Sequence, residues 1–191
     1  MFPTDTLRAA FQQGVSYEQF VDSGAPEGHD AQWHTRYSQL ELAPDQRHLI
    51  EGFAREMKVL CITGTWCGDC ALQGAAMQRI AEANPLIELR FLNRNDQPHL
   101  QMALPINAGY RVPVTFFMAE DFEPVARFGD RTLSRYRSMA RKALPNDGAG
   151  VVLTDPPDDP VRTVLQEVLN EFERTRLLLR LSPRLRELHN D

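Results

Sequence analysis

Two cysteines, Cys67 and Cys70, lie between a short apolar run and a pattern of small and apolar residues typical of a helix. The run from Lys58 to Thr63 indicates a buried strand, and the helical pattern continues to about Ala83. A thiol at the start of a helix lies near unpaired backbone N–H groups and the positive end of the helix dipole, and both favour its thiolate. The segment therefore predicts a thiol pair that can close a disulfide and exchange it with other molecules.

Length and composition limit the classes of protein to consider. The chain has 191 residues and is 42% hydrophobic, which suits one domain with additional segments. Its three cysteines are too few for a secreted disulfide scaffold. A net charge of −5, with basic residues clustered along the sequence only near the C-terminus, disfavours nucleic acid as a partner. The sequence shows neither a signal peptide nor a membrane-spanning stretch, so we expect a cytoplasmic protein with no membrane partner.

Strands and helices alternate through the middle of the chain. After the helix that begins at the cysteines, the predicted elements are strands 86–92, 112–118 and 125–128 and a helix 133–144, with a short helix near Pro98. Strand–helix–strand followed by a hairpin and a helix indicates a mixed sheet with helices on both faces.

The flanking segments have a different character. Residues 1–50 indicate an N-terminal extension of short helices, which we expect to cover a sheet edge or to gate the site. Residues 51–144 form the predicted central domain, and residues 145–160 a loop rich in Pro, Gly and Asp. Residues 161–191 are predicted as a C-terminal amphipathic helix and tail, with Asp159 as the helix cap and an apolar stripe that packs within the molecule.

Three motifs carry a resemblance to a known family. They are Trp66-Cys67-Gly68-Asp69-Cys70 between strand and helix, Arg111-Val112-Pro113 at the start of an apolar strand, and Phe128-Gly129 after the hairpin. Together they resemble the thioredoxin family over roughly residues 50–144. The resemblance implies an α/β thioredoxin-like fold, here with extra N-terminal helices and a C-terminal amphipathic helix. It also implies a cis Val112–Pro113 bond beside the cysteine pair.

The cysteine pair predicts thiol–disulfide oxidoreduction of protein or small-molecule disulfides. Cys67 is the expected nucleophile because it is nearer the helix end, and Cys70 is the expected resolving cysteine. By the resemblance, Trp66, Val112 and Pro113 contact the substrate, and the Val112 backbone pairs with it as an added strand does. The two electrons reside on the sulfurs, so we expect no organic cofactor and no metal. The expected partners are a disulfide substrate and an upstream electron donor such as a reductase.

Gly68, Asp69 and Cys61 are the residues expected to modulate the pair. Familiar thioredoxins carry proline where this chain has Asp69, and a carboxylate there should disfavour the Cys67 thiolate and make the couple more reducing. Alternatively, Asp69 points to water and does little. Cys61 stands where thioredoxins keep a buried aspartate, and we expect it to be a small core residue rather than a third redox thiol.

Two other interpretations of the cysteines stay open. One is half of a zinc site, although zinc usually has four ligands and no second close pair is present. The other is a binding or adaptor module that keeps the fold and has little redox activity.

Overall fold

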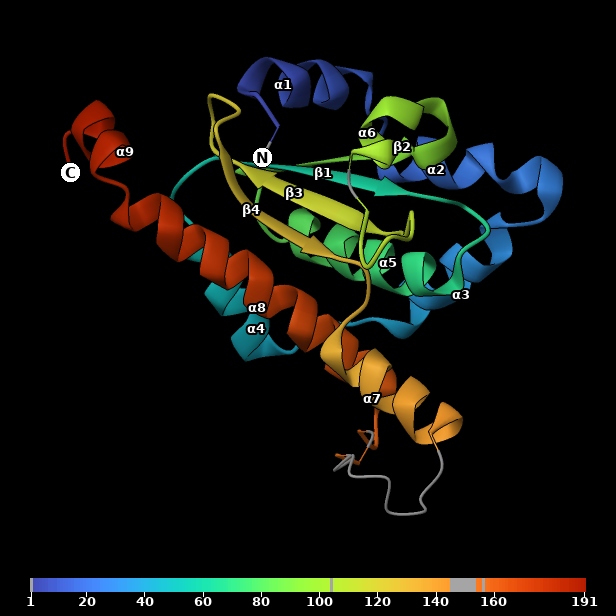
Figure 1. Cartoon of the computed structure of the whole chain (residues 1–191). Coiled ribbons are helices and arrows are strands. Elements are labelled where there is room, and N and C mark those ends of the chain that lie inside the picture. The colour runs from blue at the N-terminus through green and yellow to red at the C-terminus, as the bar shows by residue number, and fades with distance from the viewer. Residues whose placement is uncertain (1, 104, 145–153, 156) are drawn as a thin grey trace.

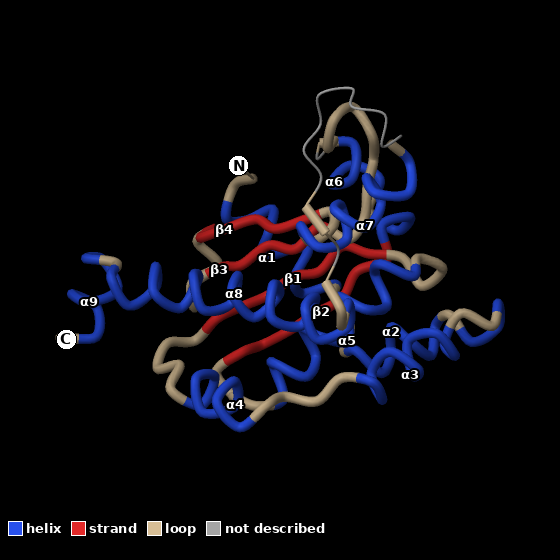
Figure 2. Tube along the Cα trace, turned by 90° about the horizontal axis from the view of Figure 1, so that it is seen from below, coloured by secondary structure: helices blue, strands red, loops and turns tan. Residues whose placement is uncertain are grey.

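The computed structural model describes residues 2–103, 105–144, 154–155 and 157–191. Within these residues, four strands form one sheet in the order β2-β1-β3-β4. Figure 1 shows the helices on its two sides, and Figure 2 shows the strands face-on, side by side. The strands are β1 (Met57–Thr63), β2 (Ile87–Asn93), β3 (Val114–Met118) and β4 (Pro124–Gly129). The predicted mixed sheet is therefore confirmed; β2 begins one residue later than expected, and β3 two residues later, after Pro113.

The register of the strands brings the end of β1, the start of β3 and the end of β4 together at one end of the sheet. β1 runs parallel to β2 and antiparallel to β3, and β3 pairs antiparallel with β4. Val114, the first residue of β3, is opposite Ile62 near the end of β1 and opposite Gly129 at the end of β4. The segment that carries the cysteines leaves β1 at this same end of the sheet.

Helices cover both faces of the sheet, as predicted. Figure 1 shows α1 and α6 on one side and α5 and α8 on the other. The α-helices are α1 (Thr4–Gln13), α2 (Tyr17–Ser23), α3 (Asp30–Gln39), α4 (Pro44–Glu51), α5 (Gly68–Glu82), α6 (Pro98–Met102), α7 (Leu133–Ala143), α8 (Pro160–Leu181) and α9 (Pro183–His189). Of the two short 3-10 helices, η1 (Ala25–Glu27) lies between α2 and α3, and η2 (Arg94–Asp96) lies between β2 and α6.

The sheet separates two apolar clusters because neighbouring residues of a strand point to opposite faces. Leu60 and Ile62 pack with residues of α1, such as Phe11, in the smaller cluster. Val59 and Cys61 belong to the larger cluster, which also contains the inner faces of α3, α5 and α8. The side of β1 that faces α5 is thus closed to solvent.

The N-terminal segment adds to this sheet rather than standing apart from it. Val15 exchanges two backbone hydrogen bonds of 2.9 Å with Phe91, so it covers the outer edge of β2. Of the two roles expected for residues before 50, covering a sheet edge is thus seen at Val15. In α3, the fully buried ring of Trp33 lies against α5 at Gly74, where an added Cβ would come within 2.4 Å of the ring. Only glycine allows this close approach.

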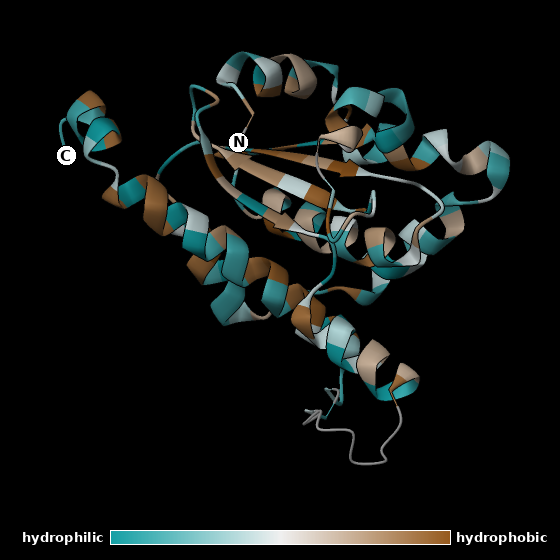
Figure 3. Ribbon diagram, viewed as in Figure 1, coloured by the Kyte–Doolittle hydropathy of each residue, from teal (hydrophilic) through white to brown (hydrophobic). Residues whose placement is uncertain are grey.

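The amphipathic helix α8 packs within the molecule, as predicted. Asp159 accepts hydrogen bonds from the N–H groups of Val161 and Arg162 and so caps the helix. Phe172 is fully buried and meets Phe117 of β3 with ring centroids 5.0 Å apart. The alternation of hydrophilic and hydrophobic residues along α8 is visible in Figure 3.

The end of the chain differs from the prediction of one helix and a tail. α8 ends at Leu181, and Ser182 accepts a hydrogen bond from the N–H of Leu185 and starts the second helix α9 with Pro183 at its first position. The division of the chain into the predicted domains stays a prediction. Most of the predicted loop 145–160, residues 145–153 and 156, lies outside the described residues.

Candidate functional site

The cysteine pair occupies the turn from β1 into α5. Cys67 is the N-cap residue of α5, and its sulfur accepts a hydrogen bond of 3.2 Å from the backbone N–H of Cys70. Cys67 is partly exposed, whereas Cys70, one turn into the helix, is fully buried. The structure therefore presents one sulfur to solvent and places the other behind it.

The two thiols differ in acidity. A hydrogen bond from the Cys70 thiol lowers the pKa of Cys67 to about 7, against the opposing effect of partial burial. Burial and the neighbouring Cys67 sulfur raise the pKa of Cys70 well above its ordinary value. At neutral pH, Cys67 is thus partly thiolate and Cys70 is a thiol, which is the distribution that a nucleophile and a proton donor need.

Pro113 and Gly129 lie at the end of the sheet where β1 leads into the cysteine segment. The Val112–Pro113 bond is cis, which confirms the prediction. Gly129 has a φ of 142°, and a Cβ on it would come within 2.5 Å of the Pro113 carbonyl oxygen. Both Val112 and Pro113 are buried, and Val112 lines the same pocket as Cys67.

Trp66 is half-exposed, at 39%, beside Cys67. The Arg94 guanidinium lies 5.2 Å from the centroid of its ring, within the range of a cation–π contact. The ring also approaches Gly64 so closely that a Cβ there would be 2.4 Å from it. Trp66 therefore has a fixed place at the rim of the pocket.

Helix α3 holds the backbone just before the motif, a contact that the sequence did not reveal. The carbonyl oxygen of Thr65 accepts hydrogen bonds from Gln32 Nε2 at 2.7 Å and from Trp33 Nε1 at 2.9 Å. His29 Nδ1 lies 3.1 Å from the Thr65 hydroxyl. The N-terminal extension thus fixes the loop that carries Trp66 and Cys67.

Asp69 is held by two arginines. Its two carboxylate oxygens each lie 2.6 Å from a guanidinium nitrogen, one from Arg131 and the other from Arg135. With a side chain 14% exposed, Asp69 does not point freely to water, so that alternative is wrong. The Asp69 charge does raise the pKa of Cys67, but the hydrogen bond from Cys70 outweighs it.

Cys61 lies behind the pair on the face of β1 that meets α5. It is fully buried, and burial raises its pKa to about 12. It belongs to the larger apolar cluster, where a small core residue is expected.

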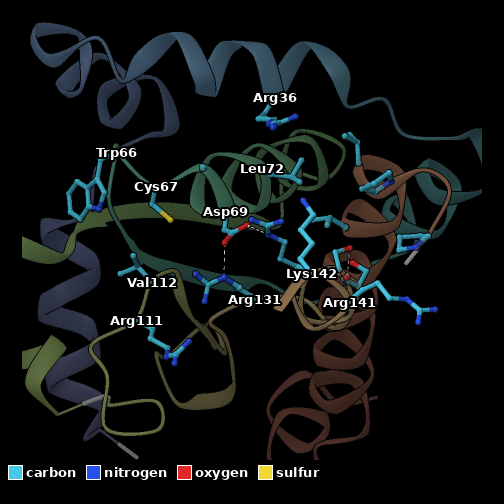
Figure 4. A pocket seen from close by; sticks show the side chains of 18 of the residues that line it. Arg36, Trp66, Cys67, Asp69, Leu72, Arg111, Val112, Arg131, Arg141 and Lys142 are labelled. Carbon is cyan, nitrogen blue, oxygen red and sulfur yellow. Dashed lines mark hydrogen bonds and ion pairs between the residues drawn. The ribbon is translucent and has the colours of Figure 1, made fainter. Parts of the chain in front are cut away.

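A pocket of about 880 Å³ opens beside Cys67 (Figure 4). Of the residues singled out in the sequence, Trp66, Cys67, Gly68, Asp69 and Val112 line it. Seven basic side chains also line it, and we call them the basic cluster: Arg36, Arg94, Arg111, Arg131, Arg135, Arg141 and Lys142. Figure 4 shows Arg111 and Arg131 on the side of Val112, and Arg141 and Lys142 across the pocket from Trp66.

This corrects the expectation that basic residues cluster only near the C-terminus. Arginines of the last helices contact acids of the chain itself: Arg180 pairs with Asp191, and Arg184 with Asp121. The basic cluster at Cys67 is assembled instead from α3, η2, the segment before β3, the loop after β4, and α7. Most of its members are far apart in sequence. The one local indication of the cluster is that arginines recur every few residues between 127 and 142.

A family model described as Thioredoxin matches residues 14–142. The chain belongs to the thioredoxin family. The match begins within the predicted N-terminal extension, so α2, α3 and α4 lie inside the matched range together with the sheet and α5.

Solved structures share the fold of this thioredoxin-family protein. A protein of unknown function from Pseudomonas aeruginosa is 19% identical with a TM-score of 0.63, over 92% of this chain and 97% of its own. An HIV epitope-scaffold is 18% identical with a TM-score of 0.59, over 88% of this chain and 95% of its own. These likenesses concern the fold alone. No curated protein matches the chain.

None of the described helices has the length and apolarity to cross a bilayer. In the same part of the chain, no three His, Cys, Asp or Glu side chains gather as a metal ion would require. Metal analysis of the purified protein remains the test of the zinc interpretation.

Proposed function

We propose that this thioredoxin-family protein is a thiol–disulfide oxidoreductase that reduces disulfides through Cys67 and Cys70. The observation that carries the proposal is the asymmetry of the pair. A partly exposed sulfur with a pKa of about 7 caps α5, and a buried thiol lies in the first turn behind it.

The reaction follows from this asymmetry. The Cys67 thiolate attacks one sulfur of the substrate disulfide, forms a mixed disulfide and releases the first substrate thiolate. Cys70 then loses its proton and attacks the Cys67 sulfur, which closes the Cys67–Cys70 disulfide and releases the second thiolate. Each released thiolate takes a proton from water or from the protein. The substrate gains two electrons, the protein loses two, and an external dithiol donor restores the pair.

The neighbouring residues have roles in binding the substrate. Trp66 offers a flat apolar surface at the rim of the pocket. We propose that the Val112 backbone, before Pro113, pairs with a bound substrate as a strand added to a sheet edge would. The electron donor is proposed to be a reductase or another dithiol protein, and the location the cytoplasm, where such a pair is kept reduced.

Insulin reduction tests the proposal. With dithiothreitol as donor, the wild-type protein should accelerate the precipitation of insulin chains, and Cys67→Ser should abolish the acceleration. Cys61→Ala is the matched control, since it removes a cysteine without touching the pair and should keep most of the activity. Equal rates for wild type and Cys67→Ser would favour the binding module instead.

Trapping the intermediate tests the order of the two cysteines. In Cys70→Ser, the mixed disulfide on Cys67 should accumulate and appear by mass spectrometry as the mass of the substrate half. In Cys67→Ser, the buried Cys70 should give little adduct. An adduct mainly on Cys70 would reverse the assignment.

A further inference from the structure

The basic cluster around Cys67 has no part in the thiol chemistry described so far. We propose that it selects low-molecular-weight disulfides that carry carboxylate groups, and this rests on the proposed function. The pocket would hold the anionic half of such a disulfide beside the Cys67 sulfur.

The charge of the pocket runs against the charge of the whole chain. Seven basic side chains line it, and within the described part of the chain their ion-pair partners are three carboxylates: Asp69 in the lining, Asp130 and Asp155. The pocket with these partners thus has an excess of four positive charges in a chain whose net charge is −5. A cluster of like charges in a concave site raises the local concentration of ligands that carry the opposite charge.

Several members of the cluster keep capacity for a ligand. Lys142 is exposed and has no ion-pair partner among the described residues. Arg111 is 38% exposed and reaches Asp130 only at 3.5 Å. Arg36 donates to the neutral amide of Gln39, at 2.9 Å, and pairs with no acid in the described part of the chain. Arginine forks match carboxylates in particular, because two N–H groups can donate to two oxygens.

The size and lining of the pocket favour a small molecule over a protein surface. Its volume of about 880 Å³ lies within the range of small-ligand sites. Leu72, Val112 and Val164 supply apolar contacts between the basic groups, as a carbon chain next to a disulfide would need. Cys67 is in the lining itself, so a ligand held there has its disulfide near the nucleophile.

Three disulfides of similar size test the proposal. They are 3,3′-dithiodipropionate, a dianion; bis(2-hydroxyethyl) disulfide, which is neutral; and cystamine, a dication. The rate of mixed-disulfide formation is measured on Cys70→Ser by mass spectrometry, and each rate is divided by the rate of the same disulfide with free 2-mercaptoethanol. This division removes differences in leaving-group chemistry.

We expect the normalised rates to decrease from dianion to neutral to dication, with about tenfold between the extremes at low salt. The difference should shrink in 0.5 M salt, where the charges are screened. On the same background, Arg111→Gln and Lys142→Gln should lower the ratio of dianion to neutral rates. Arg174→Gln, which removes an exposed cation of α8 outside the pocket, should leave this ratio as it was.

The possible failures separate the two proposals. Three equal normalised rates, or cystamine reacting fastest, would overturn the charge selection while the thiol chemistry stands. No adduct with any of the disulfides would refute the proposed function itself. A peptide disulfide flanked by glutamates that reacts much faster than the dianion would overturn the choice of a small molecule.

Discussion

Gly129 gives the sharpest test of how the sheet edge supports the site. In Gly129→Ala, the new Cβ would lie 2.5 Å from the Pro113 carbonyl oxygen and 3.2 Å from the Val114 Cα. Both are backbone atoms, so the clash cannot be relieved by rotating a side chain. The φ of 142° adds strain, because L residues rarely adopt it.

The expected loss of stability in Gly129→Ala is the sum of the backbone strain and the clash. Backbone strain at such a residue costs about 1–3 kcal/mol, and overpacking against fixed atoms costs about 1–3 kcal/mol more. For a chain of this length, 1 kcal/mol lowers the melting temperature by about 2–4 °C. We therefore expect Gly129→Ala to melt roughly 5–20 °C below wild type, and to reduce disulfides more slowly because Pro113 is displaced.

Gly28→Ala is the matched control. Gly28 also has a positive φ, 72°, but a Cβ there would have no heavy atom within 4 Å. Its substitution has only the backbone cost of about 1–2 kcal/mol, and a loss of roughly 2–8 °C by the same scaling. The melting temperatures are measured by circular dichroism. Equal losses for the two variants would refute the argument that Gly129 is required by its contact with Pro113.

Three further changes test the site. In Cys70→Ala, the pH midpoint of Cys67 alkylation by iodoacetamide should rise from about 7, because the thiol donor is lost. In Cys70→Ser, whose hydroxyl can still donate, the midpoint should stay near 7. In both variants the alkylation rate increases with pH as the thiolate forms. Asp69→Asn should lower this midpoint by about half to one pH unit, since a nearby negative charge is removed, and an unchanged midpoint would contradict this. Trp33→Phe should lower the melting temperature by about 2–4 °C through the lost hydrogen bond to Thr65, so a variant as stable as wild type would rule the contact out.

Local patterns in the sequence were enough to predict most of the fold. Alternating apolar runs and helical stripes gave the order of strands and helices, and Asp159 with Pro160 gave the start of α8. The differences are also local in origin. β3 begins at Val114 because Pro113 has no N–H to donate to the sheet. The second C-terminal helix was missed although Ser182 followed by Pro183 is a helix-start signal.

The site was predictable only in its covalent part. The motif indicates a reactive thiol pair, but the surroundings of that pair come from distant segments. Thr65 accepts hydrogen bonds from α3, more than thirty residues earlier, and Asp69 pairs with Arg131 more than sixty residues later. No period or spacing in the sequence links such positions, since only the packing of α3 against α5 and the return of the chain after β4 bring them together.

The pairing of Asp69 connects the acidity of Cys67 with the charge of the pocket. Basic groups close to a thiol favour its thiolate, and a strongly stabilised thiolate makes a couple oxidising. Asp69 opposes this, because it neutralises part of the charge of Arg131 and Arg135 and raises the pKa of Cys67 directly. On the proposed selection of anionic disulfides, the charge of members without a described acidic partner, such as Arg36 and Lys142, is left to act on the bound anion. On the two proposals together, an aspartate in this position would let one pocket attract anionic disulfides and still keep the pair suited to reduction.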